Sequence, residues 1–404
     1  MKDIQGGVCA PLGFKAAGIH CGIRKNKSKK DLALIVSDVM CHAASTYTLN
    51  KVKGAPIAVT KQHLLNGEAK AIICNSGNAN TCNPNGEDIA NAVCGLCAKE
   101  LGIDENDIIV ASTGVIGQPL DLAPFKNHMN ELVQALHSQG SSDACEGIMT
   151  TDTVKKEYAV EFEIDGVTCH IGAIAKGSGM IHPNMATMLA FVTTDVNISK
   201  EMLNEVIHKV VDDTFNMVSV DGDTSTNDML SVMANGLANN KEIVQKDESY
   251  HIFKDALMYI CELLSKGIAK DGEGATKLLT CHVNNACSQK DAKVVAKSVI
   301  TSSLFKAAMF GKDANWGRIL CAIGYCEASY DVDKIEVTLA SPVGSILVCQ
   351  NGRGYPFDED QALKILSEDE IEILIDLHDG NYQATAWGCD LTYDYVKING
   401  DYRT

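Results

Sequence analysis

The sequence predicts a layered α/β (α+β) fold, because short apolar strands alternate with amphipathic helices along the whole chain. Apolar residues make up 46% of the 404 residues and charged residues 22%, so the chain can bury a sizeable core and is not expected to be disordered. A chain of this length usually forms about two or three domains.

Two hydrophobic periods distinguish the expected strands from the expected helices. Short apolar runs predict strands at residues 33–37, 71–74, 107–111 and 157–164. Apolar residues spaced three and four apart predict helices at residues 87–101, 202–214 and 250–265. Both element types occur throughout the chain, which indicates layers of helices packed against sheets.

The last part of the chain is richer in strand-like runs. Residues 370–377 and 382–387 are two such runs, and the residues between them, His378 to Asn381, are typical of a β-hairpin turn. The polar stretch 281–288 separates two apolar blocks and predicts a boundary there. Residues 395–404 keep strand character and aromatic side chains almost to the end, which predicts that the C-terminus is held against the protein.

The charge balance excludes several classes of partner. The formal net charge is −17, from 52 acidic and 35 basic side chains, and such a surface repels the phosphates of nucleic acids. The one dense basic run, residues 24–30, is interpreted as a solvated loop. Residues 1–7 lack a signal-peptide pattern, and no run reaches the roughly 18 apolar residues that a membrane span needs. We therefore expect a cytoplasmic protein with neither a nucleic acid nor a membrane as partner.

Sixteen cysteines are scattered through the chain, mostly in apolar runs where a thiol behaves as a small hydrophobic side chain. Cys94 and Cys97 share one face of an expected helix, but no second pair at zinc-site spacing accompanies them. The loop 221–228 resembles a calcium loop superficially, yet Thr226 and Val232 occupy the positions of its required glycine and glutamate. We interpret the cysteine pair as core, expect no metal, and place the loop near the functional site.

The segment 176–190 carries the strongest local signal in the chain. Two glycines, a proline and an asparagine lie between two apolar runs, and on these grounds alone the segment is a turn. A second interpretation is self-cleavage before Thr187, because Ala186 is small and leaves its carbonyl open to attack by the Thr187 hydroxyl. An acyl shift and hydrolysis would then free the Thr187 α-amine, whose usual pKa of about 7.7–8.0 suits a base near neutral pH. Residue periodicity leaves both interpretations open.

Six blocks of the sequence form a recognisable set. They are ASTGVIG at 111–117, MTTDT at 149–153, KGSGMIHPNMATMLAF at 176–191, GEGATK at 272–277, DANWGR at 313–318 and the terminal run 395–404. In this order they resemble the ornithine acetyltransferases of arginine biosynthesis, which cut themselves between the alanine and threonine of the third block. The resemblance covers essentially the whole chain. It implies an Ala186–Thr187 cut that gives chains 1–186 and 187–404, with Thr187 as the catalytic nucleophile.

The resemblance also implies a fold and a set of site residues. The fold is a large layered domain over residues 1–280, of the kind found in self-processing aminopeptidases, and a smaller α/β domain over residues 281–404. Thr113 and Gly114 match the oxyanion-hole positions of the family. The positions that match substrate contacts are Thr150, Lys176, Thr187, Glu273, Asn399 and Thr404. Taken singly, Lys176 is interpreted as a surface residue and Glu273 as a polar loop residue.

The function implied by the resemblance is transfer of an acetyl group from N-acetylornithine to glutamate through acetyl-Thr187, without a cofactor. Glu273 would pair with the ammonium of ornithine or relay a proton, and the α-amine of Thr187 is the preferred base. Acetyl-CoA is left open as a second acetyl donor. Family members pair two processed units, so the resemblance implies a heterotetramer of two α and two β fragments.

Two other classes of function share parts of this pattern. A self-processing amidohydrolase or aminopeptidase keeps Thr187 as the nucleophile and passes the acyl group to water, so its acetate release would not depend on glutamate. A nonenzymatic binding protein predicts an uncut chain. The loop 75–80 fits a site-lining loop and a plain turn equally well.

Overall fold

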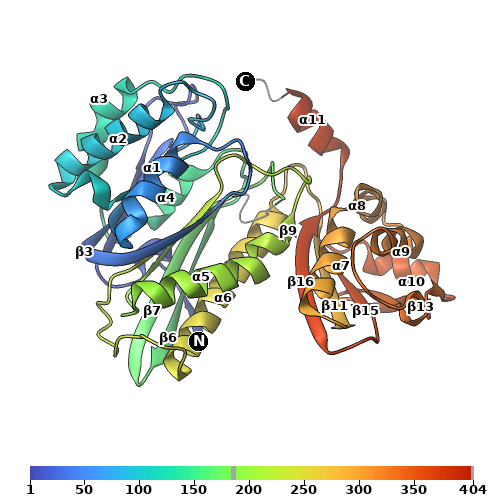
Figure 1. The fold of residues 1–404 in the computed structure, drawn as a ribbon. Coiled ribbons are helices and arrows are strands. Elements are labelled where there is room, and N and C mark those ends of the chain that lie inside the picture. The colour runs from blue at the N-terminus through green and yellow to red at the C-terminus, as the bar shows by residue number, and fades with distance from the viewer. Residues whose placement is uncertain (183–187, 402–404) are drawn as a thin grey trace.

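The computed structural model describes residues 1–182 and 188–401. The expected cleavage residues Ala186 and Thr187 and the expected substrate contact Thr404 lie outside the described residues. In the described part of the chain, two β-sheets lie side by side and each is packed against helices (Figure 1). The predicted fold class, a layered α/β (α+β) architecture, is therefore confirmed.

The larger sheet has nine strands within the described residues, in the order β1-β6-β7-β8-β10-β3-β4-β5, and β2 pairs with β3. Their bounds are β1 Lys2–Ile4, β2 Phe14–Ile19, β3 Leu32–Tyr47, β4 Glu68–Asn75, β5 Ile108–Ser112, β6 Lys156–Ile164, β7 Val167–Lys176, β8 Leu189–Thr194 and β10 Met229–Ala234. Most neighbours are antiparallel, but β8 pairs with β10 and β4 with β5 in parallel. The parallel pair brings Asn75 and Ser112, the last residues of β4 and β5, side by side.

Helices pack on both faces of this sheet. They are α1 Ala55–His63, α2 Gly86–Leu101, α3 Ala123–Gln134, α4 Ser141–Ile148, α5 Lys200–Asp213 and α6 Glu248–Lys270. Every residue of β8 is buried: Ala190 and Val192 pack in one cluster with α5 and α6, whereas Leu189 and Phe191 pack in another with α4. The predicted helices correspond to α2, α5 and α6. None of the described helices is long and apolar enough to cross a membrane.

The smaller sheet has seven strands within the described residues, in the order β14-β13-β12-β15-β11-β16-β9. Their bounds are β9 Val218–Ser219, β11 Leu278–Ala286, β12 Glu336–Ser341, β13 Gly344–Gln350, β14 Arg353–Gly354, β15 Glu370–Asp376 and β16 Tyr382–Cys389. The accompanying helices are α7 Gln289–Thr301, α8 Ser303–Phe310, α9 Trp316–Gly324 and α10 Glu359–Ile365. Because the edge strand β9 precedes α6 in the chain, this sheet is not built from C-terminal residues alone. The domain boundary near residue 280 stays a prediction.

The hairpin predicted between residues 370–377 and 382–387 is wrong. Both strands exist, but β11 lies between them, parallel to β15 and antiparallel to β16. The connecting residues bond to the end of β11 instead: the Leu377 N–H donates to the Asn284 carbonyl (3.1 Å), and the Asp379 N–H donates to the Asn285 carbonyl (2.8 Å). The turn-like residues therefore carry the chain around the end of a strand that is distant in sequence.

The polar run 281–288, interpreted above as a boundary, is mostly strand. Cys281 and Val283 of β11 are fully buried, whereas His282 and Asn284 are half-buried. This alternation is that of a strand with one core face and one wetter face. The polar residues thus mark the outer side of β11.

The described part of the run 395–404, up to Asp401, is helical, although strand was predicted for it. Helix α11, Tyr393–Asp401, projects away from the smaller sheet, and none of its residues is buried (Figure 1). Thr392 caps it, because the Thr392 hydroxyl accepts a hydrogen bond from the Tyr395 N–H (3.3 Å). Tyr395, an aromatic residue that suggested a strand, therefore lies on an exposed helix.

Candidate active site

A cavity of about 150 Å³ opens beside the end of β7 and the loop that follows β5. Its lining includes six of the residues predicted for the functional site: Thr113, Gly114, Thr150, Lys176, Glu273 and Asn399. They come from distant parts of the sequence, so the fold brings them together. The other predicted members, Ala186, Thr187 and Thr404, lie outside the described residues.

The loop after β5 carries two unpaired hydrogen-bond donors at the cavity. The Thr113 N–H donates to the Asn75 carbonyl (3.0 Å). The Thr113 hydroxyl and the Gly114 N–H, in contrast, have no partner among the described residues. Gly114 has a φ of 129°, and a Cβ there would lie 2.4 Å from the Gly77 carbonyl carbon. Only glycine therefore fits. Two unpaired donors on adjacent residues are an arrangement that can stabilise an oxyanion.

The neighbouring loop 75–80, which the sequence left undecided, contributes to the site. Ala79 lines the cavity. Asn75 accepts a hydrogen bond from the Ser112 hydroxyl through Oδ1 (2.6 Å), and the Asn78 Oδ1 accepts one from the Asn80 N–H (2.8 Å). Asn75 thus joins the ends of β4 and β5, whereas Asn78 orders the loop itself.

Asn227 fixes both loops, and the sequence did not single it out. Its amide Nδ2 donates to the carbonyls of Ala79 (2.6 Å) and Ser112 (2.9 Å), and its Oδ1 accepts a hydrogen bond from the Thr81 hydroxyl (2.6 Å). Asn227 is buried and lines the cavity together with its two preceding neighbours. The loop 221–228 therefore lies at the site, as expected.

Lys176 ends β7 and places a cation at the cavity wall. The residue is 8% exposed, and no carboxylate of the described residues forms an ion pair with it. Its register partner in β8 is Leu189, so the described chain resumes at Met188, next to Thr187 in sequence, beside this lysine. An ammonium group without an ion-pair partner is available for a substrate carboxylate.

Glu273 and Asn399 meet at the cavity from two different elements. Glu273 lies in the turn after α6, and Asn399 of α11 donates to its Oε2 through Nδ2 (2.8 Å). The Glu273 N–H donates to the Ser178 carbonyl (3.0 Å). A Cβ on Gly179 would lie 2.3 Å from the Glu273 carboxyl carbon, so a larger residue there would displace this carboxylate. Through these contacts the exposed helix α11 reaches the site.

Asp228 is a buried carboxyl group whose charge interacts with that of Lys176. It is 2% exposed, and its Oδ2 accepts no hydrogen bond from a described residue. Burial raises the pKa of Asp228 well above the usual range, although Ser225 and Lys176 act to lower it. Because burial disfavours the charged form of Asp228, this carboxyl group is a poor ion-pair partner for the cavity lysine.

Replacing Asp228 with asparagine is expected to stabilise the protein at high pH. The folded-state pKa lies above the unfolded one, so the folded protein binds the extra proton between these values and loses stability as the pH rises through them. Asparagine keeps the shape without a charge to bury, so we expect Tm to rise by about 2–4 °C near pH 8 and hardly at all near pH 4. Thermal unfolding at both pH values measures this. An equal fall in Tm at both would show instead that Asp228 is ionised and paired with Lys176.

The described residues bear on the environment of the cysteine pair and on metal binding. Cys94 and Cys97 of α2 are fully buried in an apolar cluster, as expected for core residues. Within residues 1–182 and 188–401, no three histidine, cysteine, aspartate or glutamate side chains are grouped so as to hold a metal ion.

Comparison with known proteins gives matches along the chain. The family model described as the ArgJ family matches residues 15–404. The arginine biosynthesis bifunctional protein ArgJ of Caldanaerobacter subterraneus subsp. tengcongensis is 47% identical, and the match covers 100% of both chains. ArgJ 1 of Clostridium acetobutylicum is 50% identical over 97% of this chain and 96% of its own. The crystal structure of argJ from Bacillus halodurans is 46% identical with a TM-score of 0.51, covering 54% of this chain and 100% of its own.

Proposed function

The chain belongs to the ArgJ family, and on that premise we propose that it transfers the acetyl group of N-acetylornithine to glutamate through an acetyl-Thr187 intermediate. Family membership makes it an acyltransferase of arginine biosynthesis. The observation that carries the specific proposal is the cavity. There a lysine and two hydrogen-bond donors, all without partners among residues 1–182 and 188–401, meet a carboxylate beside the point where the described chain resumes after Thr187.

In the first half of the reaction, the Thr187 hydroxyl attacks the acetyl carbonyl of N-acetylornithine and gives its proton to the Thr187 α-amine. The carbonyl oxygen becomes an oxyanion, to which the Thr113 hydroxyl and the Gly114 N–H would donate. When the C–N bond breaks, the base returns the proton to the leaving nitrogen. Ornithine departs, and the acetyl group remains as an ester on Thr187.

In the second half, the amine of glutamate attacks this ester and regenerates the Thr187 hydroxyl. Donor and acceptor share an α-carboxylate, which Thr150 and Lys176 would bind by charge-assisted hydrogen bonds. Glu273 would pair with the side-chain ammonium of ornithine. The acetyl group passes only between amino acids and the enzyme, so the exchange needs no cofactor. Acetyl-CoA as a second donor to glutamate is a further part of the proposal.

The nucleophile would be released by self-cleavage into fragments 1–186 and 187–404, of 186 and 218 residues. The length of the solved Bacillus halodurans chain supports this, because it is matched completely yet covers 54% of this chain, the share that residues 187–404 make up. We propose that two copies of each fragment form a heterotetramer. We also propose that the enzyme works in the cytoplasm, since its sixteen free thiols suit a reducing compartment.

An assay of purified protein with N-acetylornithine, with and without glutamate, tests the proposal. We expect N-acetylglutamate and ornithine to form together only when both substrates are present. Acetate release that does not depend on glutamate would favour the alternative, a self-processing amidohydrolase with the same nucleophile. Replacing N-acetylornithine with acetyl-CoA in the same assay measures the second donor directly.

A further inference from the structure

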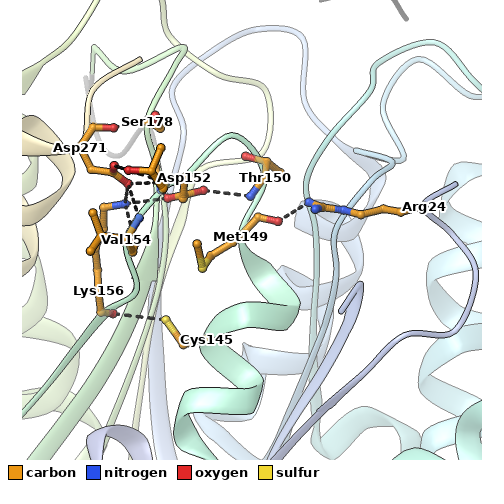
Figure 2. Close-up of polar contacts among 11 residues, drawn as sticks. Arg24, Cys145, Met149, Thr150, Asp152, Val154, Lys156, Ser178 and Asp271 are labelled. Carbon is orange, nitrogen blue, oxygen red and sulfur yellow. Dashed lines mark hydrogen bonds and ion pairs between the residues drawn. The ribbon is translucent and has the colours of Figure 1, made fainter. Parts of the chain in front are cut away.

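A buried network of charged side chains (Figure 2) contacts Thr150, which lines the cavity. The Lys156 ammonium contacts the carboxylates of Asp152 (2.8 Å) and Asp271 (2.6 Å), and these side chains are 2%, 0% and 4% exposed respectively. Lys156 begins β6, Asp152 lies in the loop between α4 and β6, and Asp271 follows α6. The network therefore joins the start of a strand, the loop before it and the end of a helix.

Asp152 holds two cavity-lining segments by their backbones. Its Oδ2 accepts a hydrogen bond from the Thr150 N–H (2.9 Å), as Figure 2 shows, and its Oδ1 accepts one from the Gly177 N–H (2.7 Å). Gly177 directly follows Lys176. Thr150 and Lys176, the two residues proposed to bind the substrate carboxylate, are thus tied to the same buried carboxylate.

Asp271 holds the turn that carries Glu273. Its carboxylate accepts hydrogen bonds from the Thr153 N–H (3.0 Å) and from the Thr153 hydroxyl. Its backbone carbonyl accepts one from the Ser178 hydroxyl (2.7 Å), and the Ser178 carbonyl in turn accepts one from the Glu273 N–H (3.0 Å). The position of Glu273 therefore depends on Asp271 in two ways. The two residues are close in sequence, and Ser178 hydrogen-bonds to the backbone of both.

The charges of this network include that of the cavity lysine. Burial opposes ionisation of Asp152, but Lys176 and Lys156 hold the pKa of that carboxyl well below its usual range. Burial also opposes the charge of Lys156, but Asp152 and Asp271 keep its pKa above the ordinary value. Buried ion pairs add little net stability because desolvation offsets their attraction, so stability alone does not account for the network.

We propose that Asp152, Lys156 and Asp271 are positioning residues of the acetyl-transfer site, which fix Thr150 and Lys176 at one side of the cavity relative to Glu273 at the other. This inference rests on the proposed function. The two sides would bind different parts of one amino-acid substrate. A change in the network should therefore weaken substrate binding more than it slows the chemical step.

Asp152→Asn tests the inference. Asparagine keeps the shape, but its NH2 group cannot accept a hydrogen bond, so at least one donor that now bonds to Asp152 loses its acceptor. We expect KM for N-acetylornithine to rise about tenfold, the effect of losing roughly one charge-assisted hydrogen bond. We expect kcat to change by less than about threefold, since the lost contact acts on binding. Steady-state kinetics with thermal unfolding of the same preparation measure both effects.

Asp195→Asn is the matched control. Asp195 is fully buried and also accepts hydrogen bonds from two backbone N–H groups, those of His170 (2.7 Å) and Leu12 (3.1 Å). His170 lies in the half of β7 away from Lys176. We expect Asp195→Asn to lower Tm with KM unchanged, which is how a purely structural aspartate behaves.

Thr153→Val gives a second readout if the Asp152 variant folds poorly. It removes one hydroxyl contact to Asp271 from an exposed residue, so we expect kcat/KM to fall roughly threefold to tenfold at nearly unchanged Tm. Wild-type KM in folded Asp152→Asn, or wild-type kcat/KM in Thr153→Val, overturns the inference while the proposed function stands. If the wild-type protein transfers no acetyl group, the proposed function fails first and this inference falls with it.

Discussion

Thr187→Ala is expected to leave the 43.3 kDa chain uncut and to reduce acetyl transfer by roughly 10⁶-fold, as loss of a catalytic nucleophile does. Alanine has no hydroxyl, so it can neither attack the Ala186 carbonyl nor accept an acetyl group. Its nitrogen would also stay in a peptide bond, so the site would lack the proposed base. Any remaining transfer would come from substrate binding and the oxyanion donors.

Mass spectrometry under denaturing conditions measures the first part of this prediction. The wild-type protein should give fragments of 186 and 218 residues, and the alanine variant a single chain. Thr187→Ser is the matched control, because it keeps a hydroxyl and should retain part of both cleavage and transfer. A fully active wild-type chain that remains whole would refute the nucleophile role.

The sequence predicted the elements that a local pattern defines and missed pairings made over long distances. The runs that form β4, β6, α2 and α5 were located because each carries its own hydrophobic period. The prediction of a hairpin at residues 370–387 is wrong because no local pattern in those residues indicates that β11 lies between the two strands. Helix α11 is different, since Thr392 is a local capping signal at its start.

The residues of the site also divide into those with a local sequence signal and those without one. Thr113, Lys176 and Glu273 are predicted because each lies in a block that resembles the family's, and all three line the cavity. Asn227 lies in a loop that the sequence places near the site, but its bond to the Ser112 carbonyl joins distant parts of the chain and is not predicted. The bond between Asp271 and Thr153 is not predicted for the same reason.

Arg24 illustrates the limit of a local interpretation. Its basic run forms a loop between β2 and β3, as predicted, but the Arg24 guanidinium also donates to the Met149 carbonyl (Figure 2). That peptide group directly precedes Thr150 of the cavity. A charge run interpreted only as solvated therefore helps to shape the site, and only the tertiary fold reveals the contact.

Thr113→Val is expected to lower kcat for acetyl transfer by roughly 10²–10³-fold, the usual cost of one lost oxyanion donor. Valine has nearly the shape of threonine and keeps the backbone N–H that donates to the Asn75 carbonyl (3.0 Å), so the loop should keep its path. The substitution removes only the hydroxyl that is unpaired among the described residues. Because that donor would act on charge developed in the transition state, KM for N-acetylornithine should change little.

Thr113→Ser is the matched control, since it restores the hydroxyl and should stay within about tenfold of wild-type kcat. Self-cleavage and transfer would use the same Thr187 nucleophile, so slow processing must be separated from slow transfer. Dividing the measured rate by the cut fraction from mass spectrometry does this. If Thr113→Val has the wild-type kcat per cut chain, the Thr113 hydroxyl is not an oxyanion donor. The Gly114 N–H would then be the donor that this loop supplies. A raised KM at unchanged kcat would instead assign the hydroxyl to substrate binding.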